Sequence, residues 1–150
     1  MLLDKKAFLG GNSVKATSGI NASESKAQKE LGIKDTNEAF EKDINQSANK
    51  GLPGPGINEI QKTMVRDSAP AVQWLSDSFG LDLSKVSRLG GHSFPRTHRG
   101  AEKFPGMAIT YAQIKWLSDM AKKEPNRMQI ITKARANKLL VNDKGEVVGC

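Results

Sequence analysis

The segment at residues 89–100, "LGGHSFPRTHRG", gathers side chains that could do chemistry. It contains both histidines of the chain, His92 and His98, together with Arg96 and Arg99. Arginine binds phosphate or carboxylate groups through paired hydrogen bonds, and histidine exchanges protons near neutral pH. The segment therefore predicts a loop that contacts an anion or a cofactor, and the alternative is a basic turn exposed to water.

Two other kinds of histidine chemistry are disfavoured by the neighbouring residues. His92 precedes Ser93 directly, but the segment contains no carboxylate that could orient the imidazole, so a catalytic triad is not indicated. The two histidines are six residues apart, without a cysteine or carboxylate between them. This spacing does not match a pair of metal ligands on one helix face, and we expect no metal site.

A second segment, "GGNSVKATSGIN", is rich in small residues that expose backbone N–H groups. Together with Asn12, Ser13 and Lys15, these groups could bind the oxygens of a flat or charged ligand. A flexible surface loop is the alternative. Asp4 ends the apolar stretch before this segment, and an acid at the end of a strand is the residue type that accepts hydrogen bonds from ribose hydroxyls.

Hydrophobic periodicity and turn residues predict the elements that position these segments. We expect a strand at 2–4, a loop at 23–35, two helices broken at 68–70, and strands separated by a hairpin turn at 142–145. The helix predicted most strongly covers 106–123, and another covers 35–50. On the second helix of the broken pair, the apolar stripe is formed by Val72, Trp74, Leu75 and Phe79. The order indicates an α/β protein with a helical insertion and a C-terminal β-meander.

Composition excludes several classes of protein. The chain has 150 residues, a net charge of +7 and a single cysteine, Cys150, so it has no disulfide framework. No basic run exceeds two residues, and we expect no nucleic-acid partner. No apolar stretch is long enough for a membrane span, and the first residues are not a secretory signal. The cytoplasm is therefore the default location.

The two Gly-rich motifs, about seventy residues apart, together carry a resemblance to a known family. "GGNSVKATSGIN" and "LGGHSFPRTHRG" resemble the flavoprotein of soluble fumarate reductases, in particular the eukaryotic form. The wider family includes succinate dehydrogenase flavoproteins and L-aspartate oxidase. The resemblance extends from "LLDKK" to "EVVGC" and implies a partial FAD-binding domain of Rossmann-like fold over residues 1–150.

The resemblance implies that FAD is the cofactor and assigns residues to it. Asp4 stands where the family has a glutamate that binds the adenosine ribose, and the backbone of Ala136 would meet the adenine. Gly19 would lie near the isoalloxazine ring and next to the dicarboxylate. The full set assigned to FAD is Asp4, Gly11, Asn12, Ser13, Lys15, Ala16, Ser18, Gly19 and Ala136.

The second motif matches the family's flavin-side loop through His92, Ser93, Arg96, His98 and Arg99. We interpret this loop as a scaffold beside the flavin and not as the proton donor. Its imidazoles and arginines would create a positive environment, which would stabilise reduced flavin and attract a dicarboxylate.

The sequence also lacks parts of the family. It has no Gly-x-Gly-x-x-Gly turn and no capping domain, which supplies the substrate-binding residues and the proton donor. We therefore expect an internal segment of a FAD-dependent fumarate reductase, in which reduced flavin transfers hydride to fumarate to give succinate. The segment would be inactive alone and would contain no catalytic residue. The alternatives are a non-catalytic degenerate paralogue with a binding or structural role, or a related flavin oxidoreductase of another acidic substrate.

The partners expected from the resemblance are a dicarboxylate, fumarate or succinate, and an electron donor. The electron donor stays open between NADH, free reduced flavin and a haem partner. A mitochondrial or other organellar location applies if an N-terminal address precedes residue 1.

Overall fold

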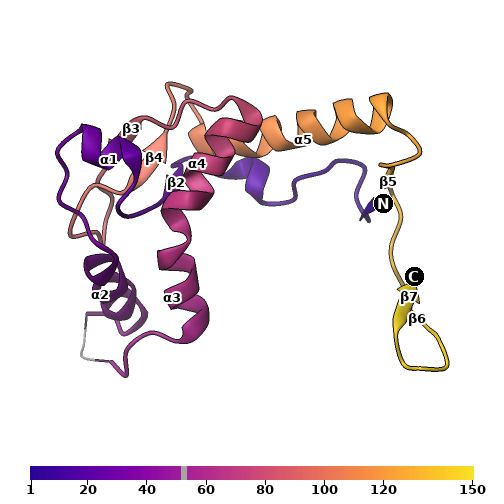
Figure 1. Ribbon diagram of the computed structural model, residues 1–150, viewed down its shortest axis with the longest axis horizontal. Helices are drawn as coiled ribbons and strands as arrows, with labels where there is room; N and C mark the ends of the chain where they lie inside the picture. The colour runs from indigo at the N-terminus through magenta and orange to yellow at the C-terminus, as the bar shows by residue number, and fades with distance from the viewer. Residues whose placement is uncertain (52–53) are drawn as a thin grey trace.

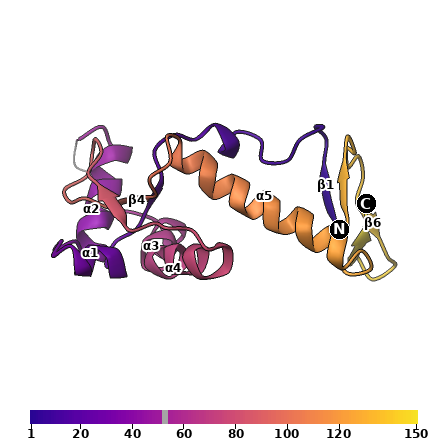
Figure 2. The same cartoon turned by 90° about the horizontal axis from the view of Figure 1, so that it is seen from above.

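The computed structural model describes residues 1–51 and 54–150. Its longest element is helix α5 (Pro105–Lys123), which runs between two groups of elements (Figure 1). A helical lobe lies at one end of α5, and short strands lie at the other end, near both chain termini (Figure 2). The 19 residues of α5 extend over about 28 Å and so set the distance between the two groups.

The helical lobe contains four helices around a small antiparallel sheet. The helices are α1 (Lys26–Glu30), α2 (Asn37–Ala48), α3 (Glu59–Arg66) and α4 (Ser68–Phe79). The sheet has the order β2-β4-β3, with β2 (Ile20–Asn21), β4 (Thr97–Arg99) and β3 (Lys85–Ser87). The hydrophobic core of the lobe lies between the sheet, α4 and the start of α5, and consists of Ala22, Val72, Leu75, Leu83 and Ile109.

Local sequence signals explain where these helices begin and end. The side chains of Ser25, Thr36 and Asn58 accept hydrogen bonds from the first turns of α1, α2 and α3. Pro70 lies in the first turn of α4, where its missing N–H group has no helical partner to lose. Gly80 ends α4 in the left-handed conformation with a φ of 66°.

The other end of the molecule contains two separate strand pairs. Strand β1 (Leu2–Asp4) pairs in parallel with β5 (Ile130–Thr132). Strands β6 (Leu140–Val141) and β7 (Val147–Gly149) form an antiparallel hairpin. The predicted hairpin turn is confirmed, but the predicted β-meander is corrected, because β5 pairs with β1 and not with β6.

The strand at 2–4, the helix at 106–123 and the break between α3 and α4 agree with the sequence predictions. The predicted loop at 23–35 is wrong for residues 26–30, because Ser25 and Gln28 form a capping box that begins α1. The predicted apolar stripe of α4 is also partly wrong. Val72 and Leu75 are buried, whereas Trp74 is 55% exposed because it faces away from them on the helix.

Within the described residues, none of the helices combines the length and apolar character that crossing a membrane requires.

Candidate functional site

The two Gly-rich motifs meet in the sheet of the helical lobe. Ile20 of β2 lies opposite His98 of β4, and Asn21 lies opposite Thr97. Gly19 immediately precedes β2 and has a φ of 143°, which side-chain-bearing residues rarely adopt. A Cβ atom on Gly19 would overlap the carbonyl oxygen of His98. Glycine at this position therefore lets the first motif approach the backbone of the second.

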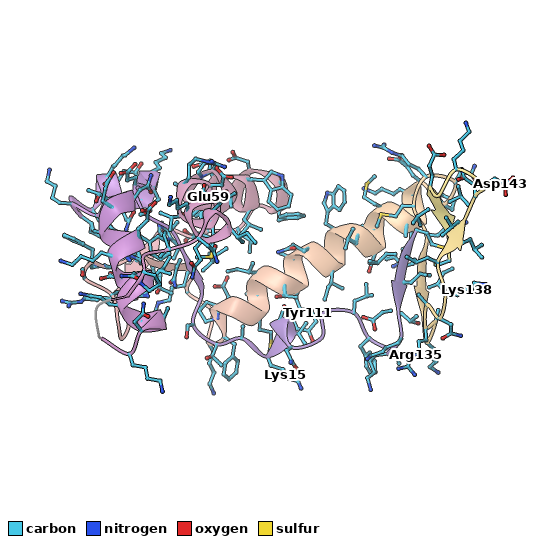
Figure 3. All side chains as sticks on the ribbon, turned by 90° about the horizontal axis from the view of Figure 1, so that it is seen from below. Lys15, Glu59, Tyr111, Arg135, Lys138 and Asp143 are labelled. Atoms are coloured by element: carbon cyan, nitrogen blue, oxygen red, sulfur yellow. The ribbon has the colours of Figure 1, made fainter. Side chains whose placement is uncertain are left out.

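The first motif forms an exposed, N–H-rich turn along α5. A short 3₁₀ helix, η1 (Ser13–Lys15), follows Gly10 and packs against α5, where the hydroxyl of Thr110 donates a hydrogen bond to the carbonyl of Ser13. Figure 3 shows Lys15 along the first half of α5, the half that carries Tyr111. Among the described residues, the backbone N–H groups of Gly11, Asn12, Thr17 and Ser18 have no hydrogen-bond partner. These donors are available to a ligand.

The residues expected at the adenosine end of FAD also lie near one another. Asp4 ends β1, and its carboxylate accepts a hydrogen bond from the N–H of Lys6 at 2.8 Å. The N–H of Ala134 donates to the carbonyl of Asp4 at 3.0 Å, which brings the segment after β5 beside it. Ala136 is exposed in this segment and lines a shallow depression with Leu3. Ligands of parallel α/β sheets bind beyond the carboxyl ends of the strands, where Asp4 lies.

Arg96 is fully buried at the centre of an ionic cluster. Its Nη2 and Nε atoms donate to the two carboxylate oxygens of Asp35 at 2.8 and 3.1 Å. Its Nη1 lies 2.9 Å from Oδ2 of Asp43, as a close ion pair and not an aligned hydrogen bond. The guanidinium also stacks on Phe40, 4.4 Å from the ring centre. One arginine thus neutralises part of the charge of two carboxylates inside the lobe.

His98 is also fully buried, and its neighbours define its protonation. Its Nδ1 lies 2.8 Å from the carbonyl oxygen of Arg96, which can only accept, so Nδ1 carries the proton. Its Nε2 therefore accepts a hydrogen bond from the hydroxyl of Ser25 at 2.6 Å. Burial lowers the pKa of His98, so the imidazole is neutral at pH 7. His98 joins β4 to the start of α1.

The glycine-rich part of the second motif is attached to α2 through Ser93. The backbone N–H and the hydroxyl of Ser93 both donate to the carboxylate of Asp43 at 2.6 Å. Although burial raises the pKa of Asp43, these hydrogen bonds and the charge of Arg96 outweigh it and lower the pKa overall. Asp43 is therefore ionised at neutral pH and fixes the loop that carries His92.

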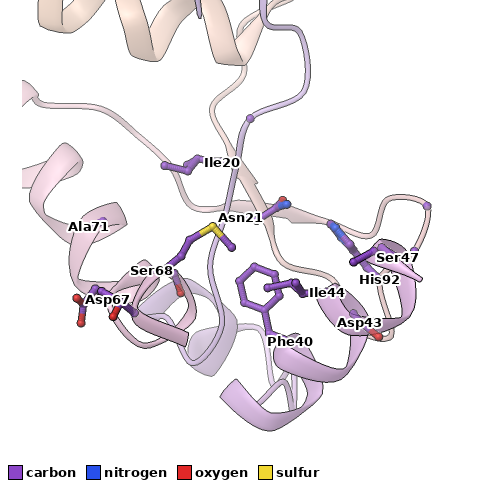
Figure 4. A pocket seen from close by; sticks show the side chains of 16 residues that line it. Ile20, Asn21, Phe40, Asp43, Ile44, Ser47, Asp67, Ser68, Ala71 and His92 are labelled. Carbon is purple, nitrogen blue, oxygen red and sulfur yellow. The ribbon is translucent and has the colours of Figure 1, made fainter. Parts of the chain in front are cut away.

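His92 lines a cavity in the helical lobe. The cavity has a volume of about 850 Å³ and lies between α2, the junction of α3 with α4, β2 and the loop at 90–92 (Figure 4). Gly19, Asn21 and Asp43 also line it, and most of its wall is apolar. Burial and the charge of Arg96 lower the pKa of His92, so its imidazole is neutral at pH 7. The volume is in the range of small-molecule sites.

The expected positive environment is corrected for Arg96 and His98. Arg96 is paired with two carboxylates, and His98 is a neutral core residue, so neither presents a charge to a ligand. Arg99 is exposed at the end of β4, so its charge is accessible to a ligand. That the loop lies beside the flavin stays a prediction.

Sequence reasoning missed Asp35, Asp43, Gln28 and Ser25 as partners of the second motif. By its local sequence, Asp35 indicates only a helix cap, and the residues that contact Arg96 and His98 lie 53 to 73 positions away in the chain. A buried arginine requires nearby carboxylates, but nothing in the sequence showed that Arg96 is buried, so no sequence signal identified these partners.

The described residues fit a long, oxygen-rich ligand such as FAD. The unpartnered N–H groups of residues 11–18 supply donors, and the small side chains around Gly19 leave the backbone open. Asp4 supplies an acceptor at the end of β1. These groups come from the first motif and the strand end, and not from the buried cations of the second motif.

Comparison with known proteins also indicates an FAD-binding domain. The family model described as "FAD binding domain" matches residues 1–150. Fumarate reductase of Schizosaccharomyces pombe is 39% identical over 150 residues, which cover 99% of this chain and 28% of that protein. Fumarate reductase 1 of Saccharomyces cerevisiae is 38% identical over 130 residues, which cover 86% of this chain and 27% of that protein.

A solved structure agrees with these relatives. The open conformation of a flavocytochrome c3 fumarate reductase matches 99% of this chain with a TM-score of 0.77 and 33% sequence identity. The match covers 24% of that structure. The chain therefore spans about a quarter of the length of the proteins that it matches.

Proposed function

The chain belongs to the FAD binding domain family, and we propose that it is the part of a longer fumarate reductase that holds FAD beside the dicarboxylate. The observation that carries this proposal is the contact between the two motifs. Gly19 abuts the carbonyl of His98 where β2 pairs with β4, and the cavity opens beside them. The relatives named fumarate reductase are 39% identical over 150 residues and 38% identical over 130 residues.

The chain's own residues would bind and orient the cofactor. Asp4 would accept hydrogen bonds from the ribose, and Ala136 would contact the adenine through its backbone. Residues 11–16 would donate backbone and side-chain hydrogen bonds along FAD, while Ser18 and Gly19 would allow close approach of the flavin ring. Bound FAD, once reduced, would supply the hydride that, together with a proton from a donor elsewhere in the longer protein, converts fumarate to succinate.

The proton donor and the family's residues that bind the substrate would come from other parts of the longer protein. The fixed backbone around Gly19 and the loop at 90–92 would form one wall of the dicarboxylate site and exclude water from it. NADH and reduced flavin are the candidate electron donors. The cytoplasm is the proposed location, unless a preceding segment carries an organellar address.

Two measurements test the proposal. An immunoblot of the source cells should detect a polypeptide several times heavier than the 16.3 kDa of these residues. That polypeptide, once purified, should contain FAD and oxidise a reduced flavin or viologen donor when fumarate is added. A heavy flavoprotein that acts on another acidic substrate and does not reduce fumarate would support the related-oxidoreductase alternative. A stable 16.3 kDa product without flavin would support the non-catalytic paralogue.

A further inference from the structure

The side chain of His92 on the cavity wall forms no hydrogen bond with the ionic cluster of Arg96, Asp35 and Asp43. Nδ1 of His92 is buried without a hydrogen-bond partner among the described residues. Nε2 likewise has no partner in the described part of the chain, but it is not enclosed, because His92 is only half-buried and lines the cavity. Nε2 is thus the ring nitrogen that a molecule in the cavity can reach.

The burial of Nδ1 without a partner indicates which ring nitrogen of His92 carries the proton. In a neutral imidazole, one nitrogen donates and the other accepts. Buried backbone N–H groups without a partner are rarer in proteins than buried carbonyl groups without one, and we apply the same preference to the imidazole. The inaccessible Nδ1 is therefore the acceptor, and Nε2 carries the hydrogen. His92 presents an N–H donor to a mostly apolar cavity.

The backbone of His92 is fixed on both sides, so this donor has a defined position. The N–H of His92 donates to the carbonyl of Leu89 at 3.3 Å, and Nε of Arg88 donates to the carbonyl of His92 at 2.7 Å. The next residue, Ser93, is bound twice by Asp43. A binding group held by such a network loses little freedom when a ligand binds.

His92 and Gly19 lie on the wall of the same cavity. Figure 4 shows the His92 ring on the same side of the cavity as the side chain of Asn21, which is two residues after Gly19. Under the proposed function, on which this step rests, Gly19 lies next to the dicarboxylate. A carboxylate only accepts hydrogen bonds, so an N–H donor at the wall complements it.

We propose that Nε2–H of His92 donates a hydrogen bond to one carboxylate of the bound dicarboxylate and so contributes to substrate selectivity. The proton stays on the imidazole, and no bond of the substrate is broken by this residue. His92 is a substrate-binding residue and not the proton donor of the reaction.

The test uses three variants of the full flavoenzyme that contains these residues. His92→Leu removes the donor and keeps a similar volume, whereas His92→Gln keeps an N–H donor near the position of Nε2. Gln73→Leu, on the outer face of α4, is the matched control for replacing a polar side chain by leucine. For each variant, KM and kcat are measured with fumarate and with monomethyl fumarate, and the Kd of succinate is measured by calorimetry.

We expect His92→Leu to raise KM for fumarate and Kd for succinate by about ten- to a hundredfold, with kcat changed much less. Its preference for fumarate over the monoester should fall. His92→Gln should recover most of the affinity, and Gln73→Leu should match the wild type.

Three results would overturn the proposal. Unchanged KM and Kd in His92→Leu would show that the side chain does not contact the substrate. Loss of FAD or a shifted flavin spectrum with unchanged succinate affinity would indicate a flavin contact instead. Equal losses in His92→Leu and His92→Gln, together with a lower thermal midpoint, would indicate a structural role. A wild-type enzyme that is inactive with fumarate would contradict the proposed function, which is a separate outcome.

Discussion

At the residue scale, the second motif separates into a buried half and an accessible half. Arg96 and His98 are completely buried and stabilise the lobe, whereas His92 and Arg99 remain accessible. A charged side chain is buried only where its charge is compensated, and Asp35 and Asp43 compensate Arg96. The same cluster fixes Ser93, so the buried half positions the accessible half.

Replacing Arg96 should destabilise the protein severely. In Arg96→Ala, the carboxylates of Asp35 and Asp43 would lose their cation inside the lobe, at a cost of about 3–5 kcal/mol in the free energy of unfolding. Arg96→Lys should recover only part of this, because an ammonium cannot bind both carboxylates in the same fork geometry. Denaturant unfolding of the full flavoprotein measures both changes.

The matched control for Arg96 is Arg127→Ala. Arg127 also forms an ion pair, with Glu124, but its side chain is 77% exposed. Exposed ion pairs contribute little to stability, so this variant should unfold at the wild-type denaturant concentration. Similar losses in Arg96→Ala and Arg127→Ala would contradict the role assigned to the buried cluster.

At the element scale, the contact between β2 and β4 connects the two motifs. The strands are short, and their pairing is supported by the hydroxyl of Thr97, which donates to the side chain of Asn21 at 2.7 Å. Gly19 enters this pair with a positive φ and no space for a side chain. The geometry of the proposed flavin and substrate contacts therefore depends on this one backbone approach.

Gly19→Ala should disturb the contact between the motifs. The added Cβ would overlap the carbonyl of His98 and would also require an unfavourable backbone conformation, so we expect a loss of about 2–4 kcal/mol in stability. FAD should dissociate more readily as well. The flavin absorbance that remains after gel filtration of the full protein measures this effect.

Gly90→Ala provides the control for this substitution. A Cβ atom on Gly90 would meet no other atom within 4 Å, and the φ of Gly90 is not in the left-handed region. We expect its unfolding free energy to change by less than about 0.5 kcal/mol. If Gly19→Ala behaved like Gly90→Ala, the close approach of the two motifs would not matter for the fold.

At the scale of the whole molecule, α5 separates the proposed substrate end from the proposed adenosine end. Figures 1 and 2 show the helical lobe and the strand pairs at its opposite ends. The hairpin of β6 and β7 exposes apolar side chains, since Val141, Val147 and Val148 are each more than half exposed. An apolar hairpin of this kind requires a covering partner or promotes association.

The exposed hairpin predicts how residues 1–150 behave when they are produced alone. They should bind the hydrophobic dye ANS strongly, because Val147 and Val148 are exposed. Val148→Lys should lower the ANS fluorescence. Asp143→Lys, in the turn of the same hairpin, introduces the same side chain without removing an apolar surface and should leave it unchanged. Equal fluorescence in all three proteins would show that the dye binds elsewhere.

Local sequence determined the elements whose stability depends on nearby residues. The periodicity of 106–123 predicted α5, the turn residues Asn142–Gly145 predicted the hairpin, and Pro70 with Gly80 marked the ends of α4. The motif from Gly11 to Gly19 also indicated FAD through its family resemblance, and the family match agrees with that cofactor. These signals operate over a few residues, so the sequence expresses them directly.

Only the tertiary structure determined which partners distant residues have. The pairing of β1 with β5, the contact of Gly19 with His98 and the burial of Arg96 between Asp35 and Asp43 all join positions far apart in the chain. A basic residue in a Gly-rich stretch has the same local sequence whether it faces a ligand or the core. The difference lies in desolvation and in the position of the compensating carboxylates, which depend on how the elements pack.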